Sequence, residues 1–200
     1  MIVRHLYTAQ FKAGVTAHQA ADWYEALTRL EIEGMRRFMG GPDLGLREGN
    51  ADFALVADFE NADAWRRYDE DEEHNQIRRE IAAEIVDKGE RCQIQAPDAD
   101  RPAPVRNVTL IWYRPDAGDD AIEATIDATS RLRVTGMEAL VAGRDLGLRA
   151  GNAHAAVVAD FNDAEAYRRY DVDEEHNRIR RELLAPIVER IARVQFRVPT

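Results

Sequence analysis

The hydrophobic pattern along the first half of the chain predicts six elements in the order β-α-β-β-α-β. Apolar and polar residues alternate over 2–12, which is the two-residue period of a strand with one buried face. The period becomes helical over 17–31, with Thr16 in position to cap the helix. The later elements are a short strand near 35–41, a strand over 52–59, a helix from about 62 and a closing strand over 90–95. This order is that of the ferredoxin-like fold.

The same pattern occurs twice in the chain. Residues 44–95 return at 146–197 without a gap, and about three positions in five are identical. The offset also holds at the front, where 3–11 aligns with 105–113. In the second copy we expect Pro186 to interrupt the later helix, because proline cannot donate a helical hydrogen bond. Two copies of one unit predict two like domains that pair with each other as the two chains of a dimer would.

The repeat also sets the predicted boundaries. The first domain covers 1–95 and the second covers 105–200. Between them, 96–104 (APDADRPAP) forms a tether with three prolines and no apolar period. Its extended length is about 30 Å, enough to place the domains side by side. The expected fold class is therefore α+β, with two ferredoxin-like βαββαβ repeats.

Charge and composition narrow the classes of partner. A formal net charge of −10 argues against nucleic acid and anionic membranes, since both require a basic surface. The chain has no run of 18 apolar residues, and its first residues lack the apolar core of a signal peptide. The single cysteine, Cys92, fits a reducing compartment, so we expect a cytoplasmic protein. Four arginine doublets stand among acidic residues and are interpreted as solvated helix faces: Arg66-Arg67, Arg78-Arg79, Arg168-Arg169 and Arg180-Arg181.

Several segments together resemble the stress-responsive dimeric α/β barrel (Dabb) family. They are RHLYTAQFKAGVT at the start, ADFALVADFENADAWRRY in the middle, the histidine that follows, and the closing strand. The resemblance covers nearly all of both repeats. It implies a ferredoxin-like fold whose sheets pair, usually between two chains, into a barrel. A tandem chain of this family would build the dimeric α/β barrel within one molecule.

The resemblance also implies a site. In olivetolic acid cyclase, a cofactor-free relative in this pattern, a tyrosine and a histidine six positions later carry the acid–base chemistry. Tyr68 and His74 match that spacing in the first repeat, as do Tyr170 and His176 in the second. A pocket-facing histidine on the first strand of the cyclase corresponds to His5. The pocket-lining, substrate-binding positions carry over to Tyr7, Trp23, Leu27, Leu55 and Ile77.

This chain departs from the family pattern at two places. The HPxH string of the family is replaced by DEEH at 71–74. The aspartate with which the cyclase orients its histidine from the last strand is replaced by Cys92 or Gln93. Without a carboxylate partner, a histidine gains less basicity.

The implied chemistry sets a geometric condition. Histidine is the natural general base near neutral pH, and a tyrosine hydroxyl can donate to a carbonyl oxygen, so the pair suits proton abstraction next to a carbonyl. On a continuous helix six residues turn about 600°, which would point Tyr68 and His74 about 120° apart. The two side chains converge only if the helix breaks within the acidic run 69–73. The alternatives are that His74 is a capping or surface residue and that His5 is a core histidine.

The two pockets are expected to differ. His5 has Asn107 as its counterpart, and Trp23 has Thr125. We therefore expect the first repeat to hold the better acid–base set, and the second to be a roomier or merely structural partner.

The resemblance and the residues together predict a cofactor-independent lyase or cyclase that acts on a small apolar carbonyl compound, such as a polyketide-like or aromatic metabolite. The alternative is a non-enzymatic, stress-associated or small-ligand-binding protein. No HExxH or phosphate-loop pattern occurs, so we expect neither a metal nor a cofactor. The expected partner is a small-molecule substrate, not nucleic acid or a membrane, and further homo-oligomerisation is left open. A hollow beside His74 favours the enzyme, whereas a filled core favours the alternative.

Overall fold

The computed structural model describes residues 1–98 and 103–198, so part of the predicted tether, 99–102, lies outside the described residues. The first repeat forms β1 (Ile2–Phe11), α1 (Ala17–Thr28), β2 (Met35–Pro42), β3 (Phe53–Phe59), α2 (Ala62–Glu70), α3 (Glu72–Ile77), the π-helical segment η1 (Arg78–Ala82), α4 (Ala83–Ile85) and β4 (Val86–Ala96). The second forms β5 (Val105–Tyr113), α5 (Asp119–Ser130), β6 (Met137–Arg144), β7 (Ala155–Phe161), α6 (Ala164–Val172), α7 (Glu174–Ile179), the π-helical segment η2 (Arg180–Leu184) and β8 (Val188–Arg197). The predicted fold class, α+β with two ferredoxin-like repeats, is confirmed.

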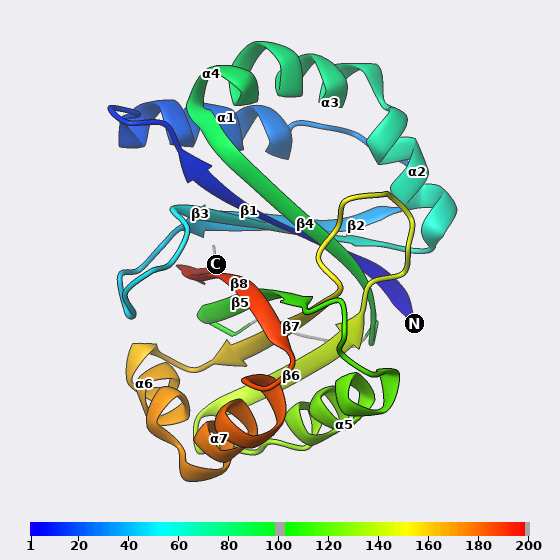
Figure 1. Cartoon of the computed structure of the whole chain (residues 1–200). Helices are drawn as coiled ribbons and strands as arrows, with labels where there is room; N and C mark the ends of the chain where they lie inside the picture. Colours follow the sequence, from blue (N-terminus) through cyan, green and yellow to red (C-terminus); the bar gives the residue numbers. More distant parts are fainter. Residues whose placement is uncertain (99–102, 199–200) are drawn as a thin grey trace.

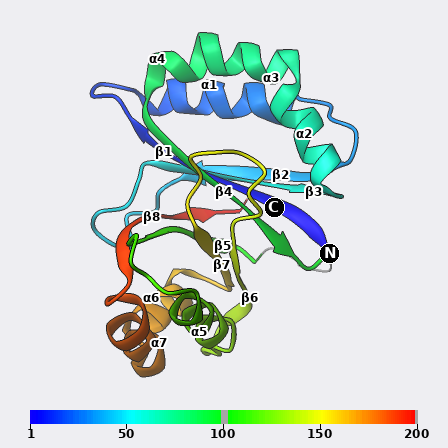
Figure 2. The same ribbon diagram turned by 45° about the vertical axis from the view of Figure 1, so that its right-hand side comes forward.

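Each repeat builds one antiparallel four-stranded sheet. The strand orders are β2-β3-β1-β4 and β6-β7-β5-β8, the same topology twice. The two sheets face each other in the middle of the molecule, and the helices cover their outer faces (Figures 1 and 2). The chain is thus a pseudo-dimer in which the second repeat takes the place of a partner chain.

The space between the sheets is a closed apolar core. Alternation along β1 sends Leu6 into this core, while Val3 and Ala9 face the helices. Buried side chains from both repeats meet there, including Leu6, Val56, Ile94, Val108, Leu110 and Phe196. A fully buried ion pair lies on the same face of each central strand. Arg4 holds Asp58 with two hydrogen bonds of 2.7 and 2.9 Å, and the second repeat repeats the pair.

Local sequence signals explain where the helices begin. Thr16 and Gln19 form a capping box at the start of α1. Asn61 caps α2 by accepting from the backbone N–H of Asp63 and of the next residue. Asp163 caps α6 at the equivalent position.

Several boundaries differ by one or more residues from the sequence prediction. Helix α1 ends at Thr28 instead of 31, and the last strand of the first repeat already begins at Val86 instead of 90. Strand β3 begins at Phe53, one residue late. Pro186 lies in the turn just after η2, where the first repeat continues into α4. It therefore ends the helix, as expected for a residue without a backbone N–H.

A loop from each repeat lies along the last strand of the other. The backbone N–H of Leu44 donates to the carbonyl of Gln195 on β8, at 2.8 Å. Leu146 donates to Gln93 on β4 at the same distance. The second loop is the yellow segment beside β4 in Figure 2. Each repeat therefore places side chains of its loop beside the other repeat, at the edge of the space between that repeat's sheet and helices.

Candidate active site

The helical backbone is interrupted between α2 and α3. This interruption is what Tyr68 and His74 need in order to converge. Helix α2 ends at Glu70, and Asp71 adopts an extended conformation (φ −60°, ψ 132°). The Asp71 carboxylate then accepts from the backbone N–H of His74 at 2.8 Å and caps α3. The result is that His74 stacks on Tyr68, with ring centroids 4.0 Å apart. Acidic residue 71, a departure from the family string, is the residue that makes the turn.

A pocket of about 300 Å³ opens beside this pair in the first repeat. It lies between the outer face of the first sheet and its helices. Of the predicted site residues, the structure brings together His5, Tyr7, Trp23, Leu27, Leu55, Tyr68 and His74 in its wall. Ile77 instead packs in the helix–sheet core and is not part of the wall. A wall with one apolar side and several polar groups can bind a small amphipathic molecule.

Burial shifts the titration of both members of the pair. His74 is 6% exposed, and burial with the nearby Arg78 charge lowers its pKa to about 4. Burial raises the pKa of Tyr68 above its usual value of 10. At neutral pH the imidazole is therefore unprotonated and the phenol keeps its proton. The pair is in the state that a proton acceptor and a hydrogen-bond donor require.

A chain of hydrogen bonds from the second repeat orients His5. Asn152 donates to Oε1 of Gln93 at 2.6 Å, so the Gln93 amide presents its N–H to Nδ1 of His5 at 2.8 Å. Asp145 accepts from Asn152 and from the Gln93 backbone, both at 2.9 Å. Neutral His5 therefore carries its proton on Nε2. Burial and neighbouring positive charges, including Arg91, lower its pKa to about 3.

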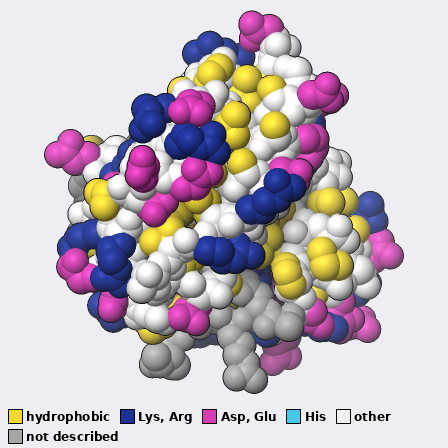
Figure 3. Space-filling model, turned by 90° about the horizontal axis from the view of Figure 1, so that it is seen from below, with side chains coloured by type: hydrophobic (Ala, Val, Ile, Leu, Met, Phe, Trp, Pro, Cys, Tyr) yellow, Lys and Arg dark blue, Asp and Glu magenta, His cyan; other side chains and the backbone are white. Residues whose placement is uncertain are grey.

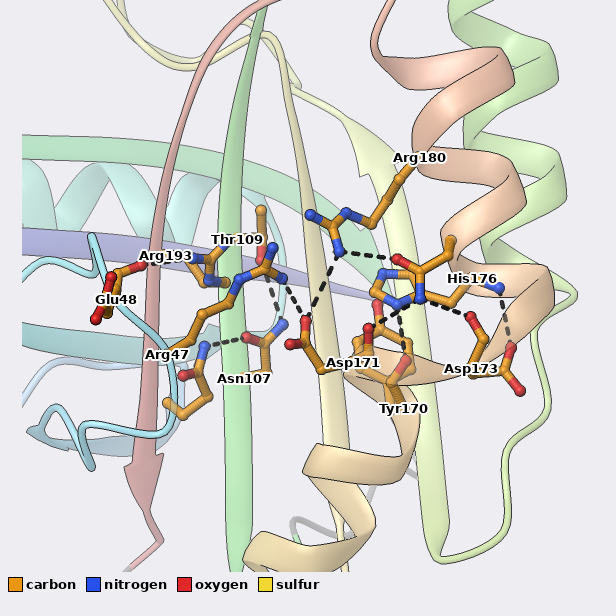
Figure 4. Close-up of polar contacts among 12 residues, drawn as sticks. Arg47, Glu48, Asn107, Thr109, Tyr170, Asp171, Asp173, His176, Arg180 and Arg193 are labelled. Carbon is orange, nitrogen blue, oxygen red and sulfur yellow. Dashed lines mark hydrogen bonds and ion pairs between the residues drawn. The ribbon is translucent and has the colours of Figure 1, made fainter.

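The second repeat reproduces the pair but encloses less space. His176 stacks on Tyr170, with centroids 3.9 Å apart, and its Nδ1 donates to the Tyr170 carbonyl at 2.8 Å (Figure 4). The Tyr68 carbonyl faces His74 in the same way but outside hydrogen-bond geometry, so Nδ1 of His74 has no partner among the described residues.

The volume of the second pocket is only about 70 Å³, so the roomier second pocket expected from the sequence is not observed. Its wall contains Leu184 and Ile191 where the first pocket has Ala82 and Gly89. These larger side chains offset the threonines that replace Trp23 and its neighbours.

The interpretation of the arginine doublets as solvated faces is wrong for two of the eight residues, Arg78 and Arg180. Exposed members pair with acidic neighbours, such as Arg79 with Glu72 at 2.7 Å. Charges of both signs are interspersed over the face seen from below (Figure 3). Arg78 and Arg180, however, line the two pockets.

Sequence reasoning also missed Arg91 and Arg149, and it named Gln93 only as one of two replacements for the aspartate of the cyclase. The two-residue period of β4 places Arg91 and Gln93 on the same face, which is a signal that could have found them. No local signal marks Arg149, which enters the first pocket from the second repeat.

Neither a metal site nor a membrane helix is seen in residues 1–98 and 103–198. No group of three or more His, Cys, Asp and Glu side chains there is placed to hold a metal ion. No helix in these ranges is long and apolar enough to cross a bilayer.

Comparisons with known proteins bear on the family. A search of curated proteins finds no significant match. Among solved structures, the chain is similar to an anthrone oxidase-like protein (15% identity, TM-score 0.73, covering 100% of this chain and 92% of that one). It is also similar to a proposed monooxygenase from Fusobacterium nucleatum (12%, TM-score 0.60, 100% and 93%). A dimeric ferredoxin-like protein of unknown function from Thermobifida fusca is 31% identical (TM-score 0.45), covering 48% of this chain and 92% of that one.

At such low identity the first two structures show a shared fold and nothing about chemistry. The family model of the stress responsive A/B barrel domain matches twice, over residues 3–93 and 105–198. These matches cover most of the chain, and they coincide with the two sheets. The chain belongs to the stress responsive A/B barrel domain family, as a member with two tandem domains.

Proposed function

We propose that the protein is a cofactor-independent lyase or cyclase that acts on a small carbonyl compound, and that its active site is the pocket of the first repeat. The single observation that supports this most is the stacked Tyr68–His74 pair beside a pocket of about 300 Å³. A core filled by side chains would have favoured a purely structural role. His74 accepts a proton from the carbon next to a carbonyl, and Tyr68 donates a hydrogen bond to the carbonyl oxygen as it becomes an enolate.

The low pKa of His74 restricts the substrate. A base with a pKa of about 4 is always available at neutral pH but binds a proton weakly. It suits a carbon flanked by two carbonyl groups, where the C–H bond is most acidic. In the cyclase reaction the enolate carbon attacks a second carbonyl of the same molecule and forms a C–C bond. The new alkoxide takes the proton back from His74, and loss of water completes an aldol-type ring closure.

His5 has a positioning role in this proposal. Its ring lies against Tyr68, with centroids 5.9 Å apart, and Gln93 holds its orientation. Asn107 replaces it in the second repeat, where Gln195 donates to the Asn107 side chain at 2.7 Å. The first repeat therefore has the larger pocket and the fuller set of acid–base groups. His176 and Tyr170 occupy the smaller pocket and are assigned the lesser role.

Exchange of a carbon-bound proton tests the proposal directly. Ethyl benzoylacetate in D₂O carries an acidic carbon between two carbonyls, and loss of its C2 proton signal can be followed by NMR. We expect His74→Gln to lower the enzyme-dependent rate at least ~100-fold and Tyr68→Phe to lower it about tenfold. His176→Gln is the matched control and should stay within about twofold of the parent rate.

The pH profile provides a second readout. Because neutral His74 is required, the exchange rate should rise as pH passes through about 4 and then stay level toward neutrality. If the His74→Gln protein folds normally and keeps the parent rate, the enzyme proposal fails and a small-ligand-binding role remains. Equal losses in His74→Gln and His176→Gln would reject the asymmetry between the repeats.

A further inference from the structure

Three guanidinium groups from three separate elements line the first pocket and lie close enough to repel one another. Arg78 comes from η1, Arg91 from β4, and Arg149 from the β6–β7 loop of the other repeat. The sequence places these residues far apart, and only the pairing of the repeats brings them together. Two carboxylates also face this pocket, those of Asp69 and Asp87. The arginines therefore outnumber the acidic groups around the pocket.

The acidic groups do not neutralise the cluster evenly. Asp69 forms an ion pair with Arg149, so these two charges neutralise each other. Asp87 is exposed to solvent. Among the described residues, Arg78 donates a side-chain hydrogen bond to the side-chain carbonyl of Asn75, at 3.0 Å, and to no carboxylate.

Arg91 is likewise paired with a neutral group, the side-chain oxygen of Asn152 at 3.3 Å. Within the described residues neither Arg78 nor Arg91 has a carboxylate within 4.0 Å. Two guanidinium groups at the wall of a pocket thus have only neutral partners. Half-burial and the repulsion of Arg149 and Arg78 lower the pKa of Arg91, and the opposing attraction of Asp69 does not offset them.

The second repeat arranges the equivalent groups differently. Asp171 pairs with Arg47 and lies 3.8 Å from Arg180, so one carboxylate serves both arginines (Figure 4). Arg193 is held by Asn50 at 3.0 Å and by the carbonyl of Glu48 at 3.4 Å. With about 70 Å³ available, this pocket has much less room for a further anion than the first. The unneutralised pair of arginines is a property of the first pocket.

We propose that the first pocket binds a carbonyl compound that carries a carboxylate, and that Arg78 and Arg91 hold this carboxylate. The apolar part of the molecule then lies along Trp23 and Leu27, which line the same pocket. Guanidinium groups suit a carboxylate because their paired N–H donors match its two oxygens. This inference deepens the proposed function by naming the second functional group of its substrate, and it concerns binding instead of turnover.

A matched pair of aryl ketones tests the inference by calorimetry. The compound 4-oxo-4-phenylbutanoate has a carboxylate where butyrophenone has a methyl group, and the two are otherwise alike. We expect the parent protein to bind the keto acid at least about tenfold more tightly than the ketone. Arg78→Met and Arg91→Met should each reduce this ratio to about threefold or less, while the variants still bind the neutral ketone.

The control is Arg79→Met, which removes the neighbouring exposed arginine and its ion pair with Glu72. It should leave the ratio unchanged. Equal binding of the two compounds by the parent protein, binding of neither, or an unchanged ratio in both pocket variants would overturn the inference. Retained ketone binding shows that each variant is folded.

The two proposals fail separately. His74→Gln should abolish proton exchange but keep the affinity ratio. Equal binding of the two compounds by a parent protein that still catalyses proton exchange rejects the carboxylate site alone. An intact ratio without any exchange in the parent protein rejects the enzyme alone.

Discussion

Replacing Gly89 by alanine should displace the phenol ring of Tyr7 from the wall of the first pocket. A Cβ atom at Gly89 would lie 1.9 Å from the Tyr7 hydroxyl oxygen and 2.6 Å from Cζ. Ordinary contacts of a Cβ begin near 3.4 Å. The second repeat avoids the conflict, because it has Thr109 and Ile191 at these two positions. In the second repeat, the larger Ile191 on β8 thus accompanies the smaller Thr109 on β5.

The size of the effect follows from the crowding. Overpacking costs about 1–3 kcal/mol, and alanine in a strand recovers roughly 0.5–1 kcal/mol relative to glycine. We expect Gly89→Ala to lower the free energy of unfolding by about 1–2 kcal/mol. Tyr7→Thr alone removes an aromatic ring that packs edge-on against Trp23, at a cost of roughly 2 kcal/mol. In the double variant the clash disappears, so its loss should fall short of the sum by about 1–2 kcal/mol.

Guanidinium denaturation followed by tryptophan fluorescence gives the four unfolding free energies of this cycle. Gly143→Ala is the matched control, because a Cβ there meets its nearest neighbour, Ile94, at 3.5 Å. It should be neutral or slightly stabilising. Additivity of Tyr7→Thr and Gly89→Ala within about 0.5 kcal/mol would refute the reasoning. So would a Gly89→Ala variant as stable as its parent.

Two further predictions concern buried charge. His74 and His176 titrate near pH 4 in the folded protein and near 6.5 when unfolded, so the unfolded chain takes up protons first as pH falls. The free energy of unfolding should drop by about 2 kcal/mol per histidine between pH 7 and 5, and glutamine at both positions should remove that part of the slope in urea denaturation. If the double glutamine variant keeps the parent's dependence of unfolding free energy on pH, this prediction is wrong. Asp58→Ala leaves the fully buried Arg4 without its bidentate partner and should cost about 3–5 kcal/mol; a loss below about 1 kcal/mol would show that the pair is dispensable.

Sequence periodicity was sufficient for the strands and for the helix starts. The two-residue period of 2–11 divides the side chains of β1 between two faces, and the structure buries both, one against the helices and one against the other sheet. Thr16 marks the start of α1 with its own side chain. The need for a break after Tyr68 followed from helix geometry alone, and Asp71 supplies it.

The pocket wall could not be predicted from local patterns. Arg149 and Asn152 enter the first site from a loop whose path depends on pairing between the repeats. Isoleucines at 77, 81 and 85 have the four-residue spacing of a regular helix, but the π-helical segment η1 follows Ile77 directly and shifts the phase of the later residues. Arg78, which lines the pocket, follows Ile77, which packs in the core, and neighbours on a helix point about 100° apart. Neither feature leaves a signature in hydrophobic spacing.

Fusion of the two repeats explains why their pockets differ. It also explains why the loops that each repeat places beside the other are alike. In a dimer of identical chains, a change such as Gly89→Ile would fill both pockets. In this chain Ile191 occupies space in one pocket and Gly89 keeps the other open. The loop that carries Arg149 has no such freedom, because it builds the first site from the second repeat. The filled repeat is therefore a working part of the open one: it supplies Asn152 to the hydrogen-bond chain of His5 and Arg149 to Asp69, so a substitution in the second repeat can alter the site in the first.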